Sequence, residues 1–335
     1  MTRRAHELFP HPAGRFRSTA PDPELLRAVR HGRPAAFTAL VDRHWQSVRG
    51  YLGTCVADDE ESDRLTGETF ARAYRLARRD PPGRLPWRVQ LFATARGSAV
   101  RLWRRDGAAA ALTDGFRQWA AAGGAWPLNQ PERLTEAYRI LPAPWQTALW
   151  YAVVEQEDGE LVARILGLRR RDARSLVASS LAGLRSTHVE LYRRASAHRP
   201  ACAPTVPSLT ARAAGRPALS AASAAHLAHC PGCGDTASDL ADLRGRLRRQ
   251  LPVLLLGWWD GHGHRRERAA AALPAHPYAF LTQETAAPGP PASAPRARTG
   301  AAVGPSSRNT DVRASARPGL PVVQPFGHSG RRDGT

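Results

Sequence analysis

A histidine and two cysteines lie close together in an otherwise cysteine-poor chain. His226, Cys230 and Cys233 have the spacing H-x3-C-x2-C, Cys202 lies upstream of them, and the remaining cysteine is Cys55. One imidazole and three thiolates form a complete tetrahedral ligand set, which is typical of structural zinc sites, whereas catalytic sites keep one position open to water. We therefore predict that Cys202, His226, Cys230 and Cys233 bind a structural Zn²⁺.

Helical spacing supports this cluster. Residues i and i+4 share one face of a helix, so His226 and Cys230 can point the same way, and the turn that follows can bring Cys233 back to them. Two alternatives stay open: reduced cysteines without a metal, and a redox-active C-x-x-C pair. His229 is a rival nitrogen ligand, but it adjoins Cys230, so its side chain should point elsewhere. We expect Cys55 to be a small buried residue of a helix.

The charge of the chain points to a polyanionic partner. Its 335 residues include 48 basic and 29 acidic side chains, a formal net charge of +19, and none of the basic residues is a lysine. Nucleic acid is the first polyanion to consider and an anionic membrane surface the second. An arginine-, alanine- and proline-rich composition also follows from a GC-rich genome, so charge alone does not decide the function.

No targeting segment is evident in the sequence. Residues 1–17 are basic but have no apolar core, so they do not form a signal peptide. The most apolar run, 251–259, is too short to cross a bilayer. Four cysteines are also too few for a disulfide scaffold. We expect a soluble cytoplasmic protein with no membrane partner.

Hydrophobic periodicity predicts helices through most of the chain and therefore an all-α fold. A chain of this length can form two or three small domains. The expected divisions are a disordered leader over 1–21, a helical domain over 22–106, a linker over 107–131, a second helical domain over 132–197, a zinc-binding domain over 198–259 and a disordered tail over 260–335. The tail is rich in Ala, Pro, Gly, Ser and Arg and poor in large apolar residues, which is typical of disorder.

Residues 159–181 have the pattern of a helix-turn-helix motif. Ala163 lies in the first helix, Gly167 at the turn, and the apolar Leu168, Ala173 and Val177 hold the second helix. Recognition helices contact DNA through their N-terminal residues. We therefore expect phosphate and base-edge contacts from the start of the second helix, at Arg169, Arg170, Arg171, Arg174 and Ser175.

The order of a helical domain, a linker and a domain ending in helix-turn-helix resembles the extracytoplasmic-function sigma factors of bacterial RNA polymerase, over residues 22–195. The segment DRLTGETFARAYRLA, residues 63–77, is similar to that family's helix for binding core polymerase. The resemblance implies core-polymerase contacts by Asp63, Glu68, Thr69, Phe70 and Arg72. Gly67 stands where the family usually has glutamine.

Helical spacing adds an independent expectation for this segment. Phe70, Ala73 and Tyr74 should pack inward, which leaves Asp63, Glu68 and Arg72 free for a charged partner. The alternative is an ordinary solvated helix face.

Residues 85–105 are similar to the family's segment for promoter melting and upstream-element recognition. Their mixture of basic and aromatic side chains suits stacking on unpaired bases and binding of phosphate. The residues expected to contact DNA here are Trp87, Arg96, Arg101, Arg104 and Arg105. The family usually has Asn and Asp where this chain has Gly97 and Arg101. Trp103 has the spacing of a core residue.

Residues 141–185 resemble the family's downstream helix-turn-helix. The matching residues are Leu141, Pro142, Leu149, Ala163, Leu166, Gly167, Leu168, Arg174 and Ser175. Leu176, Ala178 and Ser179 occupy positions that are often basic or polar in the family. A competing interpretation is therefore that this motif docks a protein instead of DNA.

The cysteine cluster resembles the zinc-binding anti-sigma domain found in partners of these sigma factors. Together the two resemblances imply a sigma factor that directs promoter recognition through core RNA polymerase and promoter DNA, restrained by its own zinc domain, and not an enzyme. Zinc loss on thiolate oxidation could couple this restraint to redox state. If zinc content and binding to core polymerase stay unchanged after peroxide treatment, the hypothesis of redox coupling is ruled out.

Two alternative functions remain open. A sigma-derived protein-interaction regulator would no longer recognise promoters. A nonspecific basic nucleic-acid binder would show steep salt dependence and no sequence preference.

Overall fold

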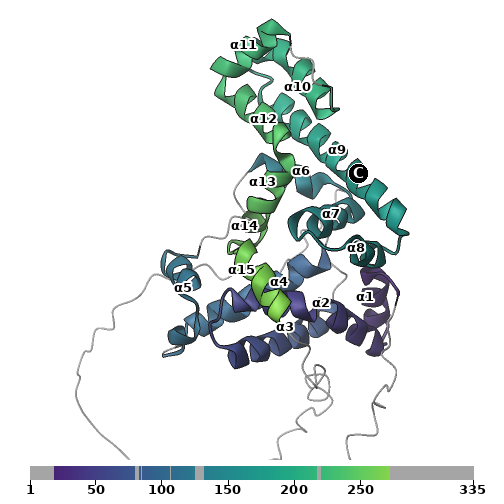
Figure 1. Cartoon of the computed structure of the whole chain (residues 1–335), viewed down its shortest axis with the longest axis vertical. Coiled ribbons are helices and arrows are strands. Elements are labelled where there is room, and N and C mark those ends of the chain that lie inside the picture. Colours follow the sequence, from purple (N-terminus) through teal and green to yellow (C-terminus); the bar gives the residue numbers. More distant parts are fainter. Residues whose placement is uncertain are drawn as a thin grey trace, which may run out of the picture. The chain divides into compact units, whose positions relative to one another are not determined.

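Helices make up most of the described part of this computed structural model, residues 19–79, 83, 85–105, 107–124, 132–216 and 220–271 (Figure 1). Within these ranges there is no β-strand beyond an isolated bridge between Val56 and Leu112, so the predicted all-α class is confirmed. In the same ranges, every helix is too short or too polar to traverse a lipid bilayer. Most of the expected leader and most of the expected tail lie outside the described residues.

The first group of helices comprises α1 (Asp22–Arg30), α2 (Ala35–Gly53), α3 (Asp59–Arg79) and α4 (Trp87–Trp103). α1 ends at a turn where Gly32 has a φ of +77°, a conformation that favours glycine. The apolar faces of the four helices meet in one core that contains Phe37, Phe70 and Phe92, each 0% exposed. In this core Trp45 stacks on Phe70 with ring centroids 5.7 Å apart. Aromatic packing thus holds α2, α3 and α4 together.

The described part of the expected linker, 107–124, contains helices. It contains the 3₁₀ helix η2 (Ala108–Ala111) and helix α5 (Asp114–Ala121). The Thr113 side chain caps α5 by accepting from the Phe116 N–H and donates to the Thr54 carbonyl at 2.8 Å. Phe116 is fully buried. A helix packed on the first group was not expected from a segment predicted to be a linker.

The second group comprises α6 (Arg133–Ile140), α7 (Ala143–Leu149), the π-helical turn η4 (Trp150–Val154), α8 (Gly159–Leu166) and α9 (Arg170–Ala195). Glu132 caps α6 and Asp158 caps α8 through carboxylates that accept backbone N–H groups. Gly167 ends α8 with a φ of +68°, which turns the chain into α9.

A third group surrounds the cysteines and has a small core of its own. It comprises η5 (Pro200–Thr205), α10 (Val206–Ala213), α11 (Ala221–His229) and α12 (Pro231–Ala241). The C-terminal turns of α9 contribute Val189 and Tyr192 to this core, beside Leu209 and Leu240. One long helix therefore spans from the second group into the third.

Residues 237–256, which have the periodicity of a single helix, form parts of three helices. α12 ends at Ala241, and α13 (Leu243–Arg249) and α14 (Leu251–Leu256) follow. The Asp242 carboxylate accepts from the Gly245 N–H and so starts a new helix, and Pro252 lies in the first turn of α14, where its missing N–H costs no hydrogen bond. All the leucines of α13 and α14 except Leu254 belong to the large core that they share with the first two groups.

Helix α15 (Gly261–Ala270) contradicts the expectation of a disordered tail from residue 260. The Asp260 carboxylate caps it by accepting from the His262 and Gly263 N–H groups. α15 packs against α2 (Figure 1). A Cβ on Gly50 would lie 2.7 Å from the Arg268 backbone, and one on Gly53 would lie 2.9 Å from Glu267. Two α2 glycines therefore make room for α15.

Candidate metal site and candidate nucleic-acid interface

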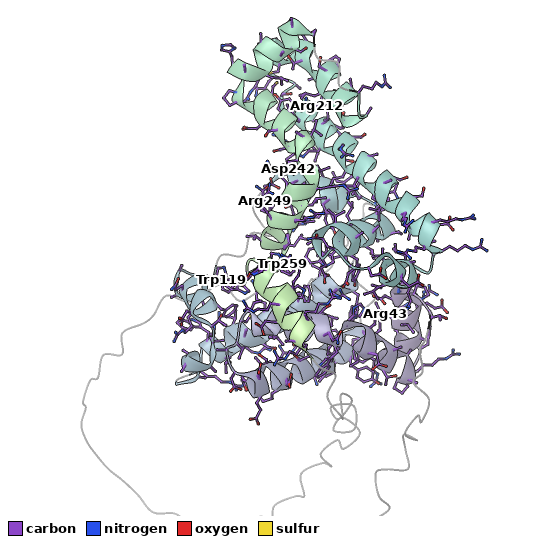
Figure 2. All side chains as sticks on the ribbon, viewed as in Figure 1. Arg43, Trp119, Arg212, Asp242, Arg249 and Trp259 are labelled. Atoms are coloured by element: carbon purple, nitrogen blue, oxygen red, sulfur yellow. The ribbon has the colours of Figure 1, made fainter. Side chains whose placement is uncertain are left out.

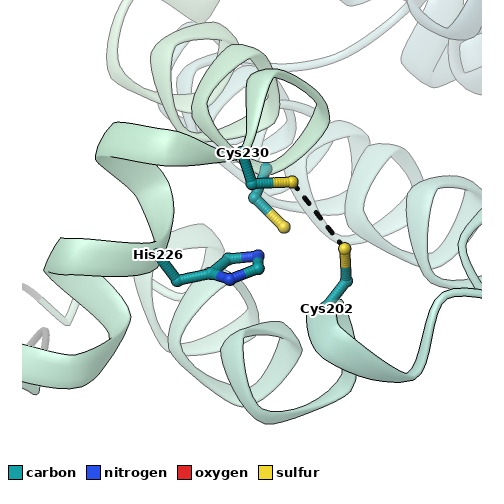
Figure 3. A group of neighbouring side chains, drawn as sticks. Cys202, His226 and Cys230 are labelled. Atoms are coloured by element: carbon teal, nitrogen blue, oxygen red, sulfur yellow. Dashed lines mark hydrogen bonds between the residues drawn. The ribbon is translucent and has the colours of Figure 1, made fainter.

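The four predicted metal ligands converge on one point. Cys202 comes from η5, His226 from α11, Cys230 from the junction of α11 and α12, and Cys233 from the first turn of α12. Their ligand atoms all lie within 4.8 Å of one another. Figure 3 shows Cys202, His226 and Cys230 pointing toward a common centre. The sulfur atoms of Cys202 and Cys230 are 3.8 Å apart. The predicted set is brought together as a candidate metal site.

Local structure explains how the chain brings these residues together. Ser220 caps α11 by accepting from the Ser223 N–H, and Cys230 ends that helix in an extended conformation. α12 then folds back closely, because a Cβ on Gly234 would lie 2.8 Å from the Leu227 carbonyl oxygen. The close crossing places Cys233 beside Cys230.

The chemistry of the donor set fits a metal ion. His226 Nε2 is buried and has no hydrogen-bond partner, which is costly unless another ligand satisfies it. The distance between the sulfurs of Cys202 and Cys230 is much longer than a disulfide bond of about 2.05 Å. The thiols therefore approach without bonding, as ligands of one ion do. Cys202, His226, Cys230 and Cys233 could together bind a metal ion.

The surroundings of the thiols differ. The backbone N–H of Cys233 lowers the pKa of Cys230, whereas burial raises the pKa of Cys233 to about 11. The Tyr192 hydroxyl lies 2.8 Å from the Cys233 sulfur. A metal must therefore displace a tightly held proton at Cys233, which links metal affinity to pH.

The other residues considered as ligands lie elsewhere. His229 is exposed, and its Nδ1 lies 2.8 Å from the Ala225 carbonyl oxygen. Cys55 is 0% exposed, and burial raises its pKa. The expectations that His229 points away from the cluster and that Cys55 is buried are confirmed, but Cys55 lies in the turn after α2 and not in a helix.

Polar contacts tie the metal-site helices to their neighbours. His188 Nε2 on α9 lies 3.0 Å from an Asp239 carboxylate oxygen on α12, and Arg246 on α13 pairs with the same carboxylate. The Arg133 guanidinium on α6 lies 5.0 Å from the centre of the Tyr192 ring. The candidate site is thus connected to α6, α9 and α13.

The predicted DNA-contacting residues of the helix pair α8 and α9 lie together at the exposed start of α9. All of them are exposed: Arg169, Arg170, Arg171, Arg174 and Ser175. Arg171 forms an exposed ion pair with Asp172 at 3.3 Å. The turn at Gly167 is covered on one side, because a Cβ there would lie 3.0 Å from Pro21.

The structure divides the residues of α4 that were expected to contact DNA. Trp87 and Arg96 are each 8% exposed. Arg96 donates to the Leu256 carbonyl at 3.3 Å, and burial lowers its pKa to about 10. Arg101 bonds Glu68 at 3.2 Å, whereas Arg104 and Arg105 are exposed. In this conformation the set does not form one surface.

The expectation that the charged residues of α3 are free is wrong. Asp63 accepts a hydrogen bond from Arg49 at 3.0 Å. Glu68 lies 3.1 Å from Arg72 and also pairs with Arg64 and Arg101. Arg49 comes from α2 and Arg101 from α4, whereas Arg64 and Arg72 lie on α3 itself, one turn from Glu68. Thr69 and Phe70, also expected at a partner interface, are buried.

Sequence reasoning missed the residues between α14 and α15. Trp259 packs against Tyr51, Phe92 and Trp150, with centroid distances of 6.2, 5.9 and 6.1 Å. Trp258 packs edge-on against Phe116 at 5.5 Å. Figure 2 labels Trp259 and Trp119, which belong to this aromatic region. Two adjacent tryptophans beside a composition typical of disorder were the available signal.

The chain matches no protein-family model, and no curated protein is significantly similar to it in sequence. The resemblance to sigma factors therefore rests on the sequence motifs and stays a prediction.

Proposed function

We propose that the protein is a sigma factor of RNA polymerase that recognises promoter DNA and is restrained by its own C-terminal part. The observation that carries the proposal is the tight turn between α8 and α9, which leaves four arginines and a serine exposed at the start of α9. Side chains at this end of a recognition helix are suited to phosphates and base edges. Its partners are core RNA polymerase and promoter DNA, its compartment is the cytoplasm, and it performs no catalytic step itself.

The metal in this proposal is Zn²⁺ in a structural role. Three thiolates and one imidazole are a typical zinc set and leave no position for a reacting water. Bound zinc would join η5, α11 and α12, and so stabilise the third helix group, which precedes α13, α14 and α15 in the chain.

The described conformation corresponds to the restrained state. α14 packs against α4 and α15 packs against α2, and the Leu256 carbonyl holds Arg96. The covering elements are therefore α14 and α15, not the metal-site helices themselves.

Burial of Trp87 and Arg96 favours the second candidate, a regulator that acts only through protein contacts. In that case the C-terminal helices would be a permanent part of the fold. The two functions differ in whether α15 can leave α2.

A single substitution on α2 tests this difference. In Gly50→Ala the new methyl group would collide with the Arg268 backbone and displace α15, while alanine favours the α2 helix. The matched control is Gly97→Ala on α4, whose Cβ would meet only the end of the Arg101 side chain, at 3.5 Å. We expect Gly50→Ala to bind core RNA polymerase at least about tenfold more tightly than the wild type, a gain of about 1.4 kcal/mol, and the control to bind like the wild type.

Binding is measured by fluorescence anisotropy of the labelled full-length chain, followed by promoter footprinting of the complexes. Absence of core binding by both the wild type and Gly50→Ala would contradict the sigma proposal. Core binding without any footprint would favour the regulator that lacks promoter recognition.

A further inference from the structure

Charged side chains from two helix groups meet in the interior of the molecule. Arg88, in the first turn of α4, is 0% exposed. Its Nη1 donates to Glu155 Oε2 at 2.8 Å and also bonds the Glu157 carboxylate, just after η4. The Glu155 and Glu157 side chains are 0% and 4% exposed. Buried carboxylates are tolerated only when paired, so Arg88 joins the first helix group to the second.

Helix α15 adds two more groups to this cluster. Arg268 Nη2 donates to Glu157 Oε2 at 2.6 Å, and His264 Nε2 lies 3.7 Å from Glu155 Oε2, an electrostatic contact. His264 is 2% exposed. Two arginines thus balance two glutamates, and one of these arginines comes from α15. Without α15, the buried cluster would carry an excess negative charge.

The backbone between the two glutamates is shaped for this arrangement. Gln156 has a φ of +55° and is the only described residue other than glycine with a positive φ. The Glu155 N–H donates to the Trp150 carbonyl and the Glu157 N–H to the Tyr151 carbonyl, at 3.0 and 2.9 Å. This left-handed turn lies between the two glutamates, whose carboxylates both contact Arg88. A left-handed conformation of glutamine costs free energy, which the surrounding contacts must offset.

On its other side Arg88 is engaged through Nε, while its Nη2 is buried without a hydrogen-bond partner. Its Nε donates to His44 Nδ1 at 3.1 Å, and His44 Nε2 lies 2.8 Å from Asp22 Oδ2. Since Nδ1 accepts, His44 is neutral and donates through Nε2. Asp22 is in turn paired with Arg43. This neighbouring set is therefore balanced by itself and cannot replace the charge of Arg268.

We propose that Arg88, Glu155, Glu157, His264 and Arg268 form a latch that closes the two helix groups and α15 as one cooperative unit. Release of α15 leaves Glu157 without its second arginine, which weakens the contact between α4 and the turn after η4. The two helix groups, which share one core, then come apart at this contact while the helices of each group stay folded. This inference concerns the conformation of the chain and does not rest on the proposed function.

Hydrogen exchange of the metal-loaded full-length protein tests the latch. Arg268→Met removes the charge that α15 contributes, and Arg266→Met is the matched control, because Arg266 is an exposed residue of the same helix whose ion pair is with Glu267. In Arg268→Met we expect exchange to be on the order of 100-fold faster in both α15 and η4, as for the loss of one partner of a buried pair. Amides of α3, remote from the latch, keep wild-type protection, and the control matches the wild type throughout.

Faster exchange in α15 with unchanged protection of η4 would overturn the proposal, because the two elements would then open independently. Gly50→Ala provides a second way to release α15 that removes no charge, and it must accelerate exchange in η4 as well. Loss of protection throughout the molecule in both variants would equally contradict a latch between intact groups. In the rebalanced variant with Arg268→Met and Glu157→Gln, we expect protection of η4 to be restored.

Discussion

The ionisation of Glu155 is controlled by its charged neighbours more than by its burial. Burial alone would raise the pKa of Glu155, but the charge of Arg88 and the contact with His264 outweigh it and lower the pKa to about 2. The Trp150 indole N–H also donates to Glu155, at 2.5 Å. The ionised carboxylate is therefore the form that the folded state stabilises.

This pKa shift predicts acid sensitivity. The pKa of Glu155 is lower in the folded chain than its ordinary value of 4.5, so its ionisation stabilises the fold above pH 4.5 and this contribution is lost as the pH falls toward 2. The loss amounts to on the order of 3 kcal/mol. In urea denaturation at a series of pH values, the wild type should lose stability more steeply over this window than Glu155→Gln. Parallel pH profiles would show that Glu155 does not carry the effect.

Gly167 is a second position where a single added atom, a Cβ, should change the stability of the fold. Its φ of +68° is unfavourable for other residues, and a Cβ would also lie 3.0 Å from Pro21. Gly167→Ala should therefore lower the free energy of unfolding by at least about 1–2 kcal/mol. Gly67→Ala on α3, where a Cβ would meet nothing within 4 Å, should be neutral or stabilising by up to about 1 kcal/mol. Equal effects of the two substitutions in thermal unfolding would rule out this explanation.

At the scale of elements, sequence reasoning succeeded where a helix carries its own signals. α8 and α9 have an apolar stripe, an Asp158 cap and a glycine at the turn, and all of these are local. The metal ligands were also predictable, since their types and spacing are local. α15 was missed because its packing depends on Gly50 and Gly53, far away in the chain. The buried pairing of Arg88 was likewise invisible, because Glu155 and Glu157 lie in another helix group.

The metal site should determine the order of the third helix group and the end of α9. Its small core contains two candidate ligands, Cys202 and Cys233, beside Tyr192. Removal of the metal by a chelator should therefore speed hydrogen exchange in α10, α11, α12 and the last turns of α9, while the first turns of α9 stay protected. If hydrogen exchange stays unchanged after metal removal has been verified, the metal site does not determine the order of this group.

Metal content provides a direct check with a matched control. Cys230→Ala removes a candidate ligand and should reduce the bound zinc per chain, measured by mass spectrometry of the purified protein. Cys55→Ala removes a buried cysteine far along the chain from the cluster and should leave the zinc content unchanged. Equal zinc in both variants would argue against these four ligands.

At the scale of the whole molecule, the segment that follows the metal-site helices returns to the first helix group. Trp258 donates through its indole N–H to Thr54 at 3.1 Å, and Tyr51 donates to the Trp258 carbonyl at 3.2 Å. Trp259 lies among aromatic rings of α2, α4 and η4. The C-terminal segment therefore joins elements from both helix groups, and it covers Arg96 while leaving the start of α9 exposed.

This difference in exposure predicts how DNA binding depends on salt. If the protein binds DNA, the closed chain does so through the arginines of α9, and displacement of α15 and the adjoining α14 in Gly50→Ala adds contacts from α4. Each added phosphate contact steepens the slope of log K against log salt by about 0.9 on duplex DNA. We therefore expect a steeper slope for Gly50→Ala than for the wild type, and a shallower slope for Arg170→Ala, which removes one exposed arginine. Identical slopes for the wild type and Gly50→Ala, measured by anisotropy without polymerase, would mean that the surface beneath the C-terminal helices does not bind DNA.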